Sequence, residues 1–107
     1  MDLNFESKYK EWINRMEELV KDAKMAASSC DVNRSLFLYG LAEWLREAGA
    51  PRARTSEEFA KLGQGYDKTI NIINEARREI VKILKEKCGC KVKSKRRLEK
   101  CLNIHNF

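Results

Sequence analysis

Residues 32–48 read VNRSLFLYGLAEWLREA in a chain of 107 residues. At a helical period, the apolar side chains of this stretch point in nearly every direction around the axis. A helix that is apolar on most sides is typical of the centre of a bundle. We therefore predict a buried central helix over 32–48, with Trp44 as an anchor of the core. Asp31 should cap its N-terminus, and a left-handed Gly49 followed by Pro51 should end it.

Two long amphipathic stretches flank this segment. Residues 3–29 repeat apolar side chains at three- and four-residue steps, which predicts a helix packed antiparallel to the central one. Residues 55–87 show the same period and open with Thr55-Ser56-Glu57-Glu58, the pattern of a capping box. Gly63 and Gly65 interrupt this third stretch, and two glycines cost a helix interior about 2 kcal/mol relative to alanine. We therefore predict a break or sharp bend between them.

The pattern as a whole predicts an all-α fold. We expect a helical bundle of four to five helices over residues 1–87 and a short basic appendage containing Cys and His over residues 88–107. The sequence has no run of 18 apolar residues and no N-terminal secretory signal, so we expect a cytoplasmic protein that does not enter membranes. An abundance of Lys and Glu with a single Gln suggests a thermophilic source.

The charge of the chain is unevenly distributed. Residues 1–50 hold 7 basic and 9 acidic side chains, whereas residues 51–107 hold 15 basic and 7 acidic ones. Residues 82–101 alone contain nine Lys or Arg against two Glu. Such an asymmetry indicates a polyanion as a partner, nucleic acid above all.

Two further segments could contribute to a nucleic-acid surface. Arg52 and Arg54 form a basic loop before the third stretch. Residues 55–73 can be aligned with a helix-turn-helix whose second helix would present Lys68 and Asn71 to the major groove, although an ordinary helix with a glycine bend explains the same residues. The basic residues that we expect to contact phosphates in the C-terminal segment are Lys91, Lys93, Lys95, Arg96, Arg97 and Lys100.

The cysteines suggest a metal site. Cys88, Cys90, Cys101 and His105 form a C-x-C-x10-C-x3-H pattern, and the last two would lie on the same side of a helix. Three thiolates and an imidazole are a ligand set typical of a structural zinc ion. Cys30 brings the total to four cysteines, so disulfides could form instead. The cysteines could also stay as free thiols. Cys30 itself is expected to be a small buried residue.

The sequence lacks a glycine-rich phosphate loop, a nucleophile elbow and a metalloprotease motif, so we expect no enzymatic activity. The expected function is nucleic-acid binding, by a small regulator or an accessory subunit of a nucleoprotein complex. The alternative is a protein-interaction module, an adaptor or inhibitor that could form a homodimer, whose basic tail docks on an acidic protein surface.

Overall fold

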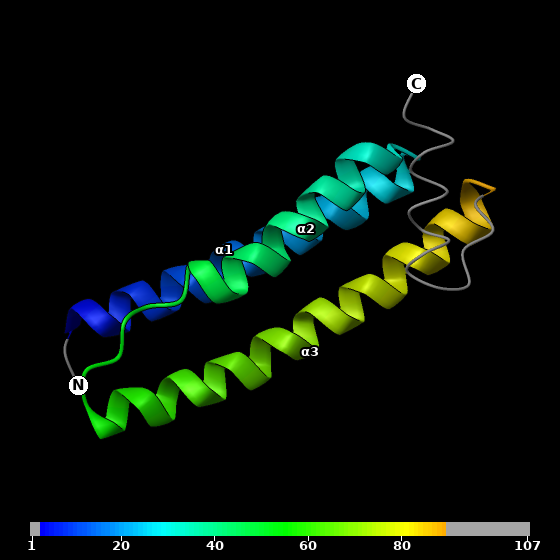
Figure 1. Cartoon of the computed structure of the whole chain (residues 1–107). Helices are drawn as coiled ribbons and strands as arrows, with labels where there is room; N and C mark the ends of the chain where they lie inside the picture. The colour runs from blue at the N-terminus through cyan, green and yellow to red at the C-terminus, as the bar shows by residue number, and fades with distance from the viewer. Residues whose placement is uncertain (1–2, 90–107) are drawn as a thin grey trace.

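The computed structural model describes residues 3–89, and this part of the chain is an all-α bundle of three helices. These are α1 (Leu3–Ser28), α2 (Val32–Ala48) and α3 (Ser56–Lys87). α2 runs back along α1, and α3 then runs the whole length of the bundle (Figure 1). The bundle measures 48 × 19 × 19 Å, and its long axis equals the length of a 32-residue helix that rises about 1.5 Å per residue. The predicted count of four to five helices is not seen in residues 3–89.

The inner face of α1 matches the predicted apolar stripe. Trp12 and Ile13 are buried at the centre of this stripe, and Met16 is completely enclosed. The same face continues through small residues to Ala27, which lets α2 and α3 approach the C-terminal half of α1 closely. α3 contributes the opposing layer of the core, which includes Ile80 and Leu84.

The bounds predicted for α2 are confirmed, but its predicted burial on all sides is wrong. Only the face formed by Val32, Ser35, Tyr39 and Ala42 is buried, because α1 and α3 cover one side of this helix. Trp44 points away from that side and is 63% exposed, so it is not a core anchor.

The tryptophan that is buried in the core is Trp12, and not Trp44 as the sequence suggested. It is 2% exposed, and its indole nitrogen Nε1 donates a hydrogen bond of 3.0 Å to the carbonyl oxygen of Leu45. This bond ties the middle of α1 to the last turn of α2. The tryptophan that holds the bundle together therefore comes from the amphipathic helix α1.

The helix ends follow the predicted capping chemistry at two positions out of three. Asp31 accepts a hydrogen bond from the amide of Arg34, and the hydroxyl of Thr55 accepts one from the amide of Glu58. The carboxylate of Glu58 reaches back to the amide of Arg54 at 2.9 Å, which completes a capping box shifted by one residue. The expected left-handed conformation of Gly49 is wrong, since its φ is −95°.

The predicted break in the third stretch is also wrong, because α3 is continuous through both glycines. Gly65 is buried and faces α1, where a methyl group added to its Cα would lie 2.7 Å from the ring of Tyr9 and 2.8 Å from that of Trp12. The missing side chain thus makes room for two aromatic rings. A helix-turn-helix is excluded as well, since its turn would lie inside this helix.

The two glycines should respond in opposite ways to alanine. Gly63 is exposed, and an added methyl group meets nothing within 4 Å, so Gly63→Ala should stabilise the protein by about 0.5–1 kcal/mol through helix propensity. Gly65→Ala should destabilise it by about 1–3 kcal/mol, because the rings of α1 must move. Urea titration of both variants measures the difference. Equal effects would show that Gly65 is not a packing position.

Candidate functional surfaces

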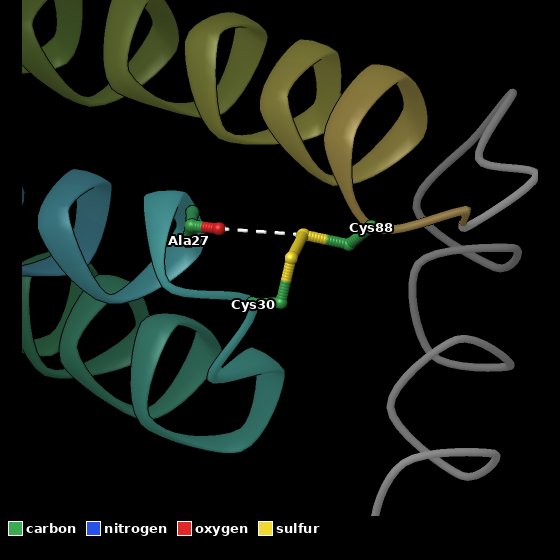
Figure 2. Close-up of a disulfide and its surroundings, with 3 residues drawn as sticks. All are labelled: Ala27, Cys30 and Cys88. Atoms are coloured by element: carbon green, nitrogen blue, oxygen red, sulfur yellow. Dashed lines mark hydrogen bonds between the residues drawn. A yellow bond between two sulfur atoms is a disulfide. The ribbon is translucent and has the colours of Figure 1, made fainter.

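A disulfide joins Cys30 in the turn between α1 and α2 to Cys88 at the end of α3, with the two Cα atoms 5.5 Å apart (Figure 2). Cys30 has a φ of 56°, a left-handed conformation that is uncommon for a residue with a side chain. The Sγ atom of Cys88 lies 3.4 Å from the carbonyl oxygen of Ala27, the contact dashed in Figure 2. A disulfide sulfur carries no hydrogen to donate, so this is a packing contact. The bridge fastens the end of α3 to the other two helices.

The disulfide bears on the predicted zinc ligands. With its sulfur bonded to Cys30, Cys88 has no thiolate to offer a metal ion. Cys90, Cys101 and His105 lie outside the described residues. Zinc binding by these residues stays a prediction that requires the reduced form of Cys88. Within residues 3–89, no three His, Cys, Asp or Glu side chains gather as a metal site.

The predicted basic loop lies at the end of the bundle where α3 begins. Arg52 and Arg54 are exposed there, beside Lys8 of α1. These three cations help to line a small pocket of about 80 Å³. The buried side chain of Glu58 also lines it, so an acidic group lies among the basic ones.

The solvent-facing side of α3 carries a second group of polar and basic residues. Lys68 and Asn71, which the sequence analysis singled out, are both exposed. From Asn71 onward, exposed side chains recur at steps of three and four residues and therefore lie on one face. We call this face the α3 stripe; it consists of Asn71, Asn74, Arg78, Lys82 and Lys85.

The acidic residues in this half of α3 face towards α1 instead. Glu79 forms an ion pair of 2.9 Å with Lys24 of α1. Glu75 lines a hollow between the two helices together with Lys21 and Lys24. Glu86 follows Glu79 by seven residues and therefore lies on the same side of the helix. Glu75 lies four residues after Asn71 and three before Arg78, so it borders the α3 stripe. The C-terminal end of the stripe approaches the point where the basic C-terminal segment begins.

The structure does not bring all of the predicted nucleic-acid residues together. The Arg52/Arg54 loop precedes α3, whereas the chain continues into Lys91–Lys100 from the opposite end of that helix (Figure 1). Because the helix is about 48 Å long, the loop and the C-terminal end of α3 are separated by most of the bundle. Lys91–Lys100 lie outside the described residues.

The outer face of α2 is the surface that the sequence analysis missed. Phe37 and Trp44 are 66% and 63% exposed, and they lie two helical turns apart on the side opposite the buried Tyr39. Gly40 is also exposed, and Leu41 is half-buried. We call these four residues, Phe37, Gly40, Leu41 and Trp44, the α2 apolar face. The signal was present in the sequence as an excess of apolar residues over what two neighbouring helices can cover.

Polar contacts with α3 hold α2 in one orientation. Arg46 donates to the hydroxyl of Thr69 at 3.1 Å and to the carbonyl oxygen of Tyr66 at 3.0 Å, and its guanidinium lies 5.2 Å from the centre of the Tyr66 ring. Burial raises the pKa of Tyr39, with a further rise from Glu43 that Arg77 opposes. These contacts fix the α2 apolar face on the outside of the bundle.

Comparison with known proteins adds no assignment: no protein-family model matches the chain, and no curated protein or solved structure matches it. Among the helices of residues 3–89, none has the length and apolarity needed to cross a membrane.

Proposed function

We propose that this protein binds the phosphate backbone of nucleic acid through the α3 stripe and the basic C-terminal segment, without catalysis. The observation that carries the proposal is the segregation of charge on α3. Arg78, Lys82 and Lys85 face solvent together, while Glu75 and Glu79 turn towards α1. Glu75, Glu79 and Glu86 lie within one turn of Arg78 or Lys82 and offset part of the repulsion between these cations, but no acidic residue lies three or four positions from Lys85. A polyanion along the stripe would relieve that repulsion and release its counterions.

The two asparagines of the α3 stripe support the same proposal. Asn71 and Asn74 are exposed in the middle of a helix, where asparagine is less favourable than alanine. Their amide groups both donate and accept hydrogen bonds, so they can pair with the edge of a base such as adenine, whereas lysine can only donate. Lys91–Lys100 extend the basic run in the sequence beyond α3. A regulator or an accessory subunit of a nucleoprotein complex would use such a surface mainly to position itself on the duplex.

The α2 apolar face favours a second candidate function, a protein-interaction module whose basic tail docks on an acidic partner. An exposed pair of large aromatic side chains is a common mark of a protein-binding surface. The two functions can be distinguished because they require different residues. Nucleic-acid binding depends on Arg78, Lys82 and Lys85, whereas a protein interface of this kind depends on Phe37 and Trp44.

The cytoplasmic location and the thermophilic source stay predictions. Structural disulfides in intracellular proteins are usual in hyperthermophiles and rare elsewhere. The Cys30–Cys88 disulfide therefore agrees with a cytoplasmic location only if the source is also thermophilic.

The test is a binding titration with a 20-base-pair DNA duplex at two salt concentrations. The variant Arg78→Gln/Lys82→Gln/Lys85→Gln should bind at least about tenfold more weakly than wild type at low salt. Its log–log salt slope should be shallower by about 2–3, since each phosphate that the protein no longer neutralises removes about one unit. The weakening should be similar for duplexes of unrelated sequence, because phosphate contacts do not read bases.

A matched control removes the same charge from another helix. Lys10, Arg15 and Lys21 are exposed on α1, but Arg15 lies on a different side of the helix from the other two, so the three do not form one stripe. The variant Lys10→Gln/Arg15→Gln/Lys21→Gln should therefore bind the duplex nearly as well as wild type. If the two triple variants show equal affinity and equal salt slope, net charge alone governs binding and the α3 stripe is not the site.

A further inference from the structure

We infer that the α2 apolar face binds a second copy of this chain, with two α2 helices packed antiparallel across a two-fold axis. This inference concerns a surface other than the α3 stripe and does not depend on nucleic-acid binding. It starts from a contrast within one helix. The inner face of α2 is buried against α1 and α3, while Phe37 and Trp44 on its outer face are each about two thirds exposed.

The spacing of the large side chains suits a copy of itself. Phe37 lies three residues before Gly40, and Trp44 lies three residues after Leu41. In an antiparallel pair centred between Gly40 and Leu41, Phe37 of each copy lies opposite Trp44 of the other. A two-fold axis pairs any two such positions, so the feature specific to this helix is its centre, where the small Gly40 of one copy faces the larger Leu41 of the other, as an isologous interface requires. A parallel arrangement would instead place each ring against its own equivalent.

Gly40 allows the two helices to approach at the centre of this pair. A methyl group added to Gly40 would meet nothing within 4 Å inside its own bundle. The position therefore leaves room that the three-helix fold does not use. Small residues between two large ones let a facing side chain enter, and Leu41 of the second copy is the apolar group nearest to that space in the antiparallel pair.

The area of the face sets the expected strength of the dimer. Aromatic side chains bury about 150–250 Å² each, so two rings that are about two thirds exposed offer roughly 200–300 Å² per copy. A specific interface buries about 600–1,000 Å² per partner, so the rings supply about a third of it and the flanking residues of α2 must supply the rest. Because the apolar area is small, we expect a weak dimer, with a dissociation constant of about 1–100 μM.

The test measures the oligomeric state of the full chain by sedimentation equilibrium from about 1 to 500 μM, a span chosen to bracket the expected constant. Wild type should change from monomer to dimer over this range. Gly40→Arg should raise the dissociation constant at least about tenfold, because it places a charge in the centre of the apolar interface. The fold should tolerate the change, since the added side chain points into open space.

Gly63→Arg is the matched control. Gly63 is also exposed on a helix with nothing within 4 Å of an added methyl group, so the variant makes the same chemical change away from the α2 apolar face and should dimerise like wild type. Phe37→Ser/Trp44→Ser should be monomeric throughout.

Two results would overturn the inference. A wild-type monomer at 500 μM would mean that something other than a second copy covers the face. In a Trp12→Phe background, where Trp44 is the remaining tryptophan, a red shift of the fluorescence on truncation after Gly89 would identify the C-terminal segment as the occupant, and no shift would point to a different protein. A dimer that Gly40→Arg and Gly63→Arg weaken equally would place the interface elsewhere. Duplex binding is measured in a separate titration, so neither result affects the proposal for the α3 stripe.

Discussion

Replacing Trp12 by alanine should lower the free energy of unfolding by about 3–5 kcal/mol, the usual cost of removing a large buried side chain. Trp12 is 2% exposed, and its ring packs edge-on against that of Tyr66 with the centroids 5.5 Å apart. The substitution also leaves the carbonyl oxygen of Leu45 without the indole hydrogen bond. A urea titration followed by circular dichroism measures the change without relying on tryptophan fluorescence.

Trp44→Ala is the matched control for this substitution. Because Trp44 is 63% exposed, its removal should change the unfolding free energy by less than about 1 kcal/mol. Both titrations belong at low micromolar protein concentration, where self-association adds little to the apparent stability. Equal destabilisation of the two variants would mean that both rings are buried, and the orientation assigned to α2 would then be wrong.

Removing the disulfide should cost nearly as much as removing Trp12. The bridge closes a loop between residues separated by 58 positions, and the loop-closure entropy of the unfolded chain then corresponds to about 4 kcal/mol. The variant Cys30→Ser/Cys88→Ser should therefore be less stable than the oxidised wild type by about 2–4 kcal/mol. Wild type treated with a thiol reductant should be destabilised by a similar amount, whereas the reductant should affect the variant much less.

Peptide mapping under non-reducing conditions controls for the choice of partner. It should recover Cys30 and Cys88 in one linked pair of peptides. Equal stability of the variant and the oxidised wild type would contradict a stabilising role for the bridge, and a map that joins Cys88 to a different cysteine would contradict the pairing. Metal analysis of the reduced wild type then tests the predicted zinc site, for which Cys88 must be a thiolate.

Helix positions and caps could be predicted because they depend on local chemistry. The apolar period of 32–48 predicted both bounds of α2, and the side chains of Asp31 and Thr55 cap the helices that follow them. Each of these features requires only residues within a turn or two of one another.

The errors concern contacts between residues far apart in the sequence. Propensity predicts a break at Gly65, but the rings of Tyr9 and Trp12, more than fifty positions away, occupy the space beside it. The pairing of Cys30 with Cys88 likewise depends on where the first turn meets the end of α3. The apolar pattern predicts a buried Trp44 because it shows which faces of a helix can be buried, and not how many neighbouring helices are there to cover them.

The candidate surface on α3 depends on the local spacing of residues along one helix. The alignment with a helix-turn-helix predicts exposed positions for Lys68 and Asn71, and both are exposed on α3 although the turn of that motif is absent. The continuous helix adds Lys82 and Lys85 to the face that holds Asn71. That alignment of charges could have been predicted, because Asn71, Lys82 and Lys85 all follow Gly65 and share a face of the helix with or without a bend there.

The most direct measurement of the proposed function is the salt dependence of duplex binding by wild type and by Arg78→Gln/Lys82→Gln/Lys85→Gln. If the α3 stripe and the basic C-terminal segment bind phosphates, log K for wild type should fall linearly with log salt with a slope of about −4 or steeper. The slope for the variant should be shallower by about 2–3. A wild-type affinity that does not depend on salt, or no binding of the duplex at low salt, would contradict the proposal.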